Sequence, residues 1–224
     1  MLDGLYRQIL IEAFPNSDRD VRARELTVLH AFFCAAEPTS QTVVATLLSA
    51  PNDNDLHIAS VADIVGKLHA VLYTDNGRVL SYHKSFSDFL FNKDRSQDFF
   101  CDQAAHQRLL AEASFHVMKS GLRFNIARIP SSFMLDCDNP TLATEIERNI
   151  PPTLRYSCQH WSHHVCSSIE THSDPLHHAL LEFLRLPVLS WIEAMNLLGL
   201  RGLCEAMLRR AGNWVKTVSC TLST

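Results

Sequence analysis

The sequence predicts a mainly α-helical protein with a single β-hairpin among its helices, and three observations support this prediction. Apolar residues recur at spacings of three and four along most of the chain, which is typical of amphipathic helices. Asp75-Asn76-Gly77 separates two short apolar runs, and Asn and Gly tolerate the positive φ of a tight hairpin. Seven glycines and nine prolines, with the prolines at apparent element boundaries, suit a helix-rich chain.

Four helices are expected ahead of the hairpin. The first begins at Leu2 and stops at Pro15-Asn16. Ser17-Asp18 caps the second, and Thr39-Ser40 opens the third, which Pro51 ends. The apolar stripes of the second, third and fourth helices are, in order, Leu26, Leu29 and Phe33; Val43, Val44, Leu47 and Leu48; and Val61, Ile64, Val65 and Leu68.

The hairpin is expected over residues 71–82, and His83 opens a closing helix directly after it. Phe86, Phe89 and Leu90 share one face of that helix. Three helices, a hairpin and a closing helix predict a winged-helix domain over residues 17–98. Its wing would deliver His83 to a fixed place.

Residues 99–224 are expected to form an all-helical bundle or short superhelical domain. Gly121 is the expected C-cap of its first helix, and the stretch from Arg123 to Pro140 is irregular. Asp174-Pro175 and Pro187 each start a further helix. The expected apolar stripes are Leu109, Ala113, His116 and Val117; Leu142, Ile146 and Ile150; Leu154, Cys158, Trp161 and Val165; Leu176, Ala179, Leu180 and Phe183; Val188, Trp191, Ile192 and Met195; and Leu203, Met207 and Trp214.

The pattern His-x-Ser-Phe-x-Asp-Phe-Leu that begins at His83 resembles the winged-helix segment of NACHT-type STAND NTPases. The resemblance is to the region after the nucleotide-binding core of the large fungal members that end in WD40 or other repeats. Weaker similarities lie at Leu2–Leu10, Leu154–Trp161 and Leu189–Gly199, so the likeness extends over nearly the whole chain.

The resemblance implies a role for one residue and a set of partners. In that family the winged-helix histidine contacts the β-phosphate of ADP and holds the closed, inactive state, a role that falls to His83 here. Residues 1–16 would be the terminal helix of a preceding domain. The implied partners are a NACHT core, in cis or in trans, and a C-terminal repeat sensor. Oligomerisation is expected only of the activated parent protein, which would act in fungal non-self recognition or programmed cell death.

The residues that nucleotide hydrolysis requires are missing from the sequence. A P-loop needs Gly, four residues, then Gly-Lys-Ser/Thr, so that backbone N–H groups cradle the phosphates. Gly66-Lys67 has Val61 in place of the first glycine and Leu68 in place of the hydroxyl residue. No apolar run ends in the paired carboxylates of a Walker B motif. The chain is therefore not expected to be an enzyme or to hold a cofactor alone; ADP or ATP with Mg²⁺ would bind only together with a NACHT core.

Composition and charge narrow the function classes. A net charge of −4 and a pI near 6.3 give no reason to expect binding to nucleic acid or to an anionic membrane. Seven cysteines without a Cys-x-x-Cys pair favour reduced thiols over a disulfide framework. No apolar run is long enough for a membrane span and no signal peptide opens the chain, so a cytoplasmic location is expected.

Two sharper hypotheses are set aside. The run Cys158–Cys166 contains His160 and His164 four residues apart, which could chelate zinc, but the spacing of known zinc motifs is missing and packing explains the run better. We therefore expect no metal. DNA binding through the expected helix at Ser40–Ser49 is also disfavoured, because that segment has no Lys or Arg and Asp53, Asp55 and Asp63 lie nearby.

The function expected from these observations is that of a regulatory arm of a STAND-type signalling NTPase. The arm would hold the ADP-bound closed state through His83 and would link the NACHT core to the C-terminal sensor. The alternatives are a stand-alone helical adaptor that binds other proteins and, third, a nucleic-acid-binding winged helix.

Overall fold

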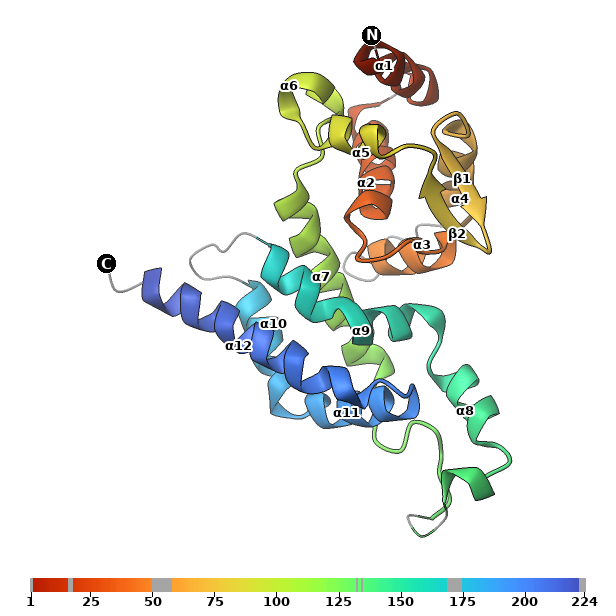
Figure 1. Cartoon of the computed structure of the whole chain (residues 1–224), viewed down its shortest axis with the longest axis vertical. Helices are drawn as coiled ribbons and strands as arrows, with labels where there is room; N and C mark the ends of the chain where they lie inside the picture. The colour runs from red at the N-terminus through yellow and green to blue at the C-terminus, as the bar shows by residue number, and fades with distance from the viewer. Residues whose placement is uncertain are drawn as a thin grey trace. The chain divides into compact units, whose positions relative to one another are not determined.

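The computed structural model describes residues 2–15, 18–49, 58–131, 133, 135–168 and 175–221, with side chains as far as residue 216. This part of the chain is mainly helical and contains one two-stranded antiparallel sheet, as the sequence predicts (Figure 1). The chain divides into two compact units, Met1–Leu110 and Ala111–Thr224. The division falls inside helix α7, so the first turns of α7 belong with the first unit.

The first unit begins with four helices. Their bounds are Leu2–Ala13 (α1), Arg19–Cys34 (α2), Gln41–Ser49 (α3) and Ile58–Lys67 (α4). The Asp18 carboxylate accepts the Asp20 N–H and caps α2, whereas the other expected cap residue, Ser17, and the expected stop at Pro51 lie outside the described residues. The Ser40 hydroxyl accepts the Val43 N–H at 3.3 Å and opens α3. Helices α2, α3 and α4 pack on one another. They bury the apolar side chains predicted for α3 and α4 except Leu48, which is partly exposed.

The hairpin pairs β1 (Leu72–Asp75) with β2 (Arg78–Ser81), which confirms the prediction from the turn sequence. Asn76 and Gly77 have φ values of 48° and 75°, and these two positive angles let the chain reverse within two residues. The Val79 N–H donates to the Thr39 carbonyl at 2.9 Å and so ties the hairpin to the segment before α3.

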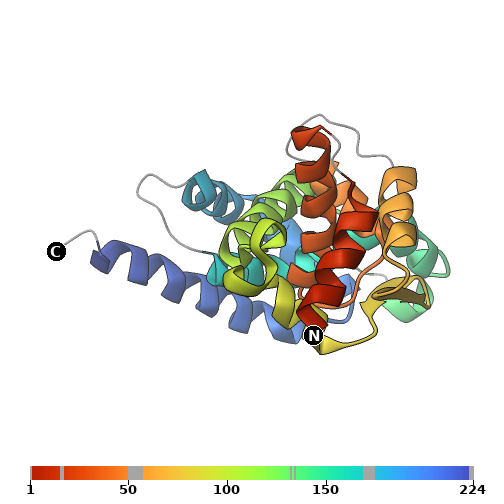
Figure 2. The same ribbon diagram turned by 90° about the horizontal axis from the view of Figure 1, so that it is seen from above.

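Helix α5 (Lys84–Leu90) closes this arrangement and buries Phe86, Phe89 and Leu90, the three residues that the sequence places on its inner face. The Phe86 ring contacts Tyr6 of α1 and Phe33 of α2 at centroid distances of 5.1 and 5.4 Å. Helix α1 packs beside α5 and α6 (Lys93–Ser96), as Figures 1 and 2 show. The short 3₁₀ helix η1 (Gln97–Phe99) then leads to α7.

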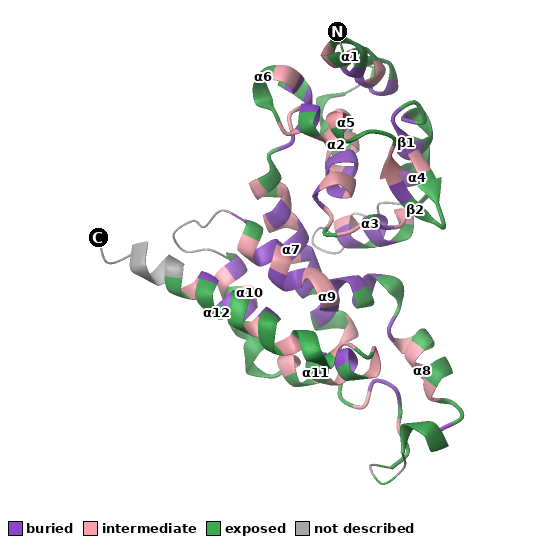
Figure 3. Cartoon of the chain, viewed as in Figure 1, coloured by how far each residue is buried: buried purple, intermediate pink, exposed green. Residues whose placement is uncertain are grey.

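In the second unit every described element is helical. The bounds are Gln103–Gly121 (α7), Asp136–Asp138 (η2), Leu142–Asn149 (α8), Pro152–Ser167 (α9), Pro175–Arg185 (α10), Pro187–Leu197 (α11), Arg201–Leu203 (η3) and Cys204–Thr221 (α12). Helix α9 packs against α11 and α12, and α10 packs against α11. All four residues of the predicted stripe on α9, Leu154, Cys158, Trp161 and Val165, are buried. Figure 3 shows buried positions alternating with more exposed ones along this helix.

Aromatic side chains form the centre of this second core. The indole of Trp161 contacts the rings of Phe183, Phe115 and Trp191 at centroid distances of 5.0, 5.6 and 5.8 Å. The Trp191 Nε1–H donates to the Cys158 carbonyl at 2.9 Å. This hydrogen bond provides an acceptor for an N–H group that is buried away from water.

Several expectations for this unit are wrong. His116 and Ile192, which the sequence analysis placed on the apolar faces of α7 and α11, are exposed. Gly121 does not have the positive φ of a C-cap glycine; it is the last residue of α7, and a Cβ added there would lie 3.0 Å from Leu154 Cδ2. Glycine at this position allows α9 to approach α7 closely. Leu203 does not extend the buried stripe of the last helix, because it lies in η3 and is 48% exposed. The expected N-cap Asp174 lies outside the described residues, and α10 begins at Pro175.

Among the described helices, none combines the length and the apolar character that a membrane crossing requires.

Replacing Phe86 by Ala should lower the free energy of unfolding by about 3–5 kcal/mol, because the ring is fully buried between α1, α2 and α5 and its removal leaves a cavity. Urea denaturation followed by circular dichroism measures the change. Tyr82→Ala is the matched control, since Tyr82 is 64% exposed. Equal effects of the two substitutions would contradict the assignment of Phe86 to the core.

Candidate functional site

His83 lies between β2 and α5 and is exposed. It has extended backbone angles, and its Nδ1 accepts the backbone N–H of Ser85 at 3.0 Å. The first N–H groups of a helix have no partner within the helix, so a side-chain acceptor at this position stabilises the helix start. His83 is therefore the N-cap residue of α5.

The cap fixes which ring nitrogen of His83 carries the proton. The Ser85 N–H can only donate, so Nδ1 must present its lone pair, and the proton of the neutral ring lies on Nε2. The Ser85 hydroxyl lies 2.7 Å from Nδ1, and the Tyr6 hydroxyl lies 2.6 Å from the Ser85 hydroxyl. With Nδ1 as acceptor, Ser85 donates to His83 and Tyr6 donates to Ser85.

This chain of hydrogen bonds holds the ring from one side only. No described residue bonds to the outer nitrogen of His83, Nε2, while Tyr6 anchors the other end of the chain in the core, where it is 6% exposed. The arrangement presents one oriented N–H donor at the surface. The neighbouring residues Tyr82 and Lys84 are exposed as well.

A pocket of about 440 Å³ lies in the second unit, apart from the residues that the sequence analysis proposed as a site. It is lined by residues of α7, α10 and the start of α11, among them Phe115, His116 and Phe183. The ammonium of Lys119 and the carboxylate of Glu182, which also line it, pair at 3.3 Å. The pocket combines an apolar wall with a paired charge, and its described lining residues include no serine or cysteine.

The histidine-rich run on α9 is part of the second core. His164 is fully buried, and its Nε2 lies 2.9 Å from the Tyr156 hydroxyl. Burial, followed by the charges of His163 and His160, lowers the pKa of His164 to about 3. Burial also raises the pKa of the Cys158 thiol to about 12, with a smaller contribution from Cys204. Both groups are neutral near pH 7, as packing residues should be.

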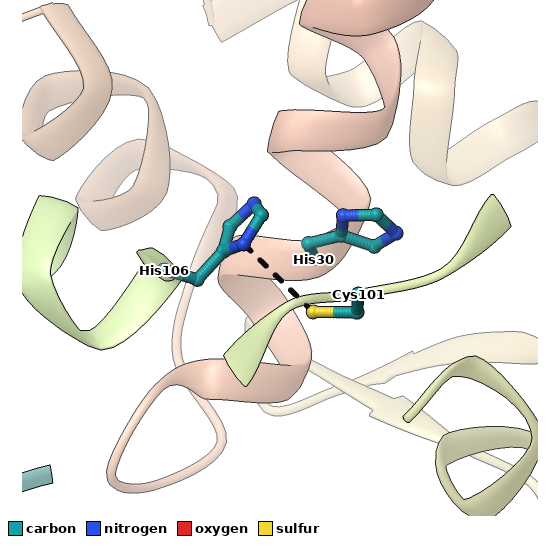
Figure 4. A group of neighbouring side chains, drawn as sticks. All are labelled: His30, Cys101 and His106. Atoms are coloured by element: carbon teal, nitrogen blue, oxygen red, sulfur yellow. Dashed lines mark hydrogen bonds between the residues drawn. The ribbon is translucent and has the colours of Figure 1, made fainter. Parts of the chain in front are cut away.

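A second cluster, which the sequence analysis missed, lies in the first unit. It comprises His30, Cys101 and His106, whose donor atoms all lie within 4.8 Å of one another (Figure 4). A fourth residue, Cys34, adds a thiol 3.6 Å from that of Cys101. We call these four residues the His–Cys cluster. His30, Cys34 and Cys101 are buried, whereas His106 is partly exposed.

The environment of the His–Cys cluster favours the neutral forms of His30 and Cys101. Burial, followed by the charge of His106, lowers the pKa of His30 to about 4. The adjacent thiol of Cys34, followed by burial, raises the pKa of Cys101 far above its ordinary value. A thiol in this state is a poor nucleophile. The cluster is thus not equipped for cysteine catalysis.

The sequence contains a signal for this cluster in two spacings, His30-x₃-Cys34 and Cys101-x₄-His106. The first places both side chains on one face of a helix. Neither spacing is specific alone, and only the fold brings α2 beside the segment that follows η1.

Comparison with models of protein families, with curated proteins and with solved structures found no match to the chain.

Stability of the second unit should fall as the pH drops below about 6.5, the ordinary histidine pKa. In that range the unfolded chain binds a proton at His164, whereas the folded chain does so only near pH 3. At about pH 4.5 the loss should amount to about 2–3 kcal/mol relative to about pH 7.

Urea denaturation at the two pH values, followed by tryptophan fluorescence, measures this loss, because all three tryptophans lie in the second unit. His164→Asn should shrink the difference between the two pH values, and His178→Gln, at an exposed position on α10, should leave it unchanged. An unchanged difference in His164→Asn would show that His164 does not cause the pH dependence.

Proposed function

We propose that the chain is the regulatory arm of a STAND-type signalling NTPase, in which a winged-helix domain closes over ADP bound to a NACHT core. His83 would donate a hydrogen bond to a phosphate oxygen in the closed state. The helical second unit would link the core to a C-terminal sensor and would transmit ligand binding to it.

The element order of the first unit supports this proposal. Three packed helices, α2 to α4, precede the hairpin, and α5 closes it, which is the order of a winged helix. His83 lies at the exit of the hairpin, at the position that the family resemblance assigns to the sensor histidine.

The observation that carries the proposal is the orientation of the His83 ring. The cap occupies Nδ1, and no described residue bonds to Nε2, so the Nε2–H remains available to a ligand. A phosphate oxygen accepts such a donor without any rearrangement of the protein. A histidine that served only as a cap could be replaced by Asn or Ser, which cap helices at least as well but do not extend a donor this far.

The energetic scale suits a switch. A hydrogen bond to a charged phosphate contributes about 1.5–3 kcal/mol. If it forms only in the closed state, it shifts the ratio of closed to open molecules by roughly 10- to 150-fold. That is enough to change basal signalling without locking the protein permanently.

Because the sequence has no P-loop, the purified chain should not hydrolyse nucleotide. Incubation with Mg²⁺ and ATP should give no phosphate release above a heat-denatured control. Calorimetry should likewise find no micromolar nucleotide binding, because a single histidine cannot replace the ring of N–H donors of a P-loop. Turnover, or tight binding, would contradict the proposal that the nucleotide site belongs to another segment.

Two substitutions of His83 separate its capping role from its proposed sensor role, and both are to be tested with the NACHT core present, in cis or supplied in trans. His83→Asn keeps an acceptor for the Ser85 N–H but lacks the outer donor, so it should preserve thermal stability and accelerate ADP release by roughly 10- to 150-fold. His83→Ala should accelerate release equally and also lower stability by about 0.5–2 kcal/mol.

Lys84→Ala is the control for nonspecific loss of a polar residue, because Lys84 is exposed next to His83 and no contact with phosphate is proposed for it. It should change neither ADP release nor basal signalling. If His83→Asn releases ADP as slowly as the unaltered protein, His83 is a cap and the sensor role is wrong.

One observation favours a second candidate, a helical adaptor that binds another protein. Leu186 and Leu189, at the start of α11, are 76% and 67% exposed, and Leu181, Leu184 and Ile192 are partly exposed nearby in sequence. Replacing Leu186 and Leu189 by Ser should then abolish capture of a partner by the isolated chain and leave ADP release from the NACHT-containing protein unchanged. If the double substitution instead leaves partner capture unchanged and alters ADP release, the result favours the regulatory arm.

A further inference from the structure

The His–Cys cluster brings four metal-binding side chains from three segments to one place in the first unit. His30 and Cys34 lie one turn apart on α2, Cys101 follows η1, and His106 lies in the first turn of α7. The helices around it bury mainly apolar residues, so two thiols and two imidazoles gathered at one point are unusual.

Two of the separations in the cluster are close to those of a tetrahedral zinc site. Zinc bonds of about 2.3 Å to sulfur and about 2.0 Å to nitrogen separate two sulfurs by about 3.8 Å and a sulfur from a nitrogen by about 3.5 Å. The thiols of Cys34 and Cys101 lie 3.6 Å apart, and Cys101 Sγ lies 3.9 Å from His106 Nδ1. With the histidine of α2 included, the largest separation among the His30, Cys101 and His106 donors stays within 4.8 Å. Binding would therefore require the most widely separated donors to move closer by up to about 1.5 Å, which a change in side-chain torsion angles can supply.

The hydrogen bonds of His30 orient its ring for a metal. Its Nε2 lies 3.1 Å from the Phe99 carbonyl and donates to it, so Nδ1 carries the lone pair. Figure 4 shows one ring nitrogen of His30 on the side of His106 and the other pointing away. A backbone carbonyl that accepts the second ring N–H is the usual support of a metal-bound histidine. His106 Nδ1 also lies 2.9 Å from the Asp102 carbonyl, a contact that a metal at this nitrogen would replace.

We propose that His30, Cys101 and His106 bind a zinc ion, with Cys34 as the fourth ligand. Two thiolates and two neutral imidazoles around Zn²⁺ sum to zero charge, which a buried site tolerates. Both thiol protons leave on binding, and the metal supplies the positive charge that stabilises the thiolates. Softer thiolate and imidazole donors select zinc over Mg²⁺ or Ca²⁺.

A closed site of this kind is structural. It would clamp the end of α2 to the segment between η1 and α7, where Gln107 also donates to the Cys34 carbonyl at 2.9 Å. A disulfide between Cys34 and Cys101 is the rival use of the same two thiols, but it would give the two histidines no role.

The experiment measures zinc in the full chain purified under reducing conditions, followed by exchange for Co²⁺. We expect about one zinc ion per chain and, with Co²⁺, the visible absorption of a tetrahedral ion together with a thiolate-to-cobalt charge-transfer band. A chelator should remove the metal and lower the melting temperature. Metal-free protein without a charge-transfer band on Co²⁺ addition, or a Cys34–Cys101 disulfide in the purified chain, would overturn the proposal.

Single substitutions then locate the site. His106→Gln, at a partly exposed position that should fold, and Cys101→Ser should each reduce bound zinc to near background, and Cys34→Ser should weaken the charge-transfer band. His116→Gln and Cys137→Ser are the controls at exposed positions and should keep the zinc. Zinc that persists in His106→Gln and Cys101→Ser would place it elsewhere and overturn the assignment. The zinc content and the cobalt charge-transfer band do not depend on His83. A failure of the zinc proposal can therefore be distinguished from a failure of the proposed function.

Discussion

The first N–H groups of helix α5 have no acceptor within the helix, and a ring nitrogen of His83 accepts one of them. That hydrogen bond joins the end of the hairpin to the start of the closing helix. Phe86 lies one turn further along α5 and contacts Tyr6 and Phe33. The cap and the aromatic core of the first unit therefore both depend on where α5 begins. The Tyr6 hydroxyl completes the connection through Ser85. One residue thus couples a surface donor to a buried aromatic cluster.

The cap also separates the two nitrogens of His83 by role. Nδ1 accepts the hydrogen bond that caps α5, and Nε2 carries the donor at the surface. Because the cap already holds the ring in place, binding of a ligand to Nε2–H would cost little further side-chain conformational entropy. In the proposed mechanism, this pre-organisation is the reason that a solitary histidine can act as a sensor.

Much of the fold could be predicted from local sequence. The hairpin follows from Asn76-Gly77, and the buried faces of α5 and α9 follow from helical spacing, because these features depend on neighbours in the chain. Gly121 could not be assigned correctly, since its requirement comes from Leu154 on another helix. The His–Cys cluster was missed for the same reason: its four side chains meet only when α2 packs beside residues that are about 70 positions later in the sequence. The position of His83 was predictable, but the orientation of its ring depends on the contact with Ser85.

The tautomer of His83 tests the central claim most directly. Nitrogen-15 NMR of the imidazole distinguishes a protonated ring nitrogen from one that accepts a hydrogen bond. The account predicts an unprotonated Nδ1 and a protonated Nε2 in the free chain near neutral pH, with only the Nε2 signal shifting strongly when an ADP-loaded NACHT core is added. A proton on Nδ1, or a core-induced shift confined to Nδ1, would contradict it, because the cap would then not orient the donor.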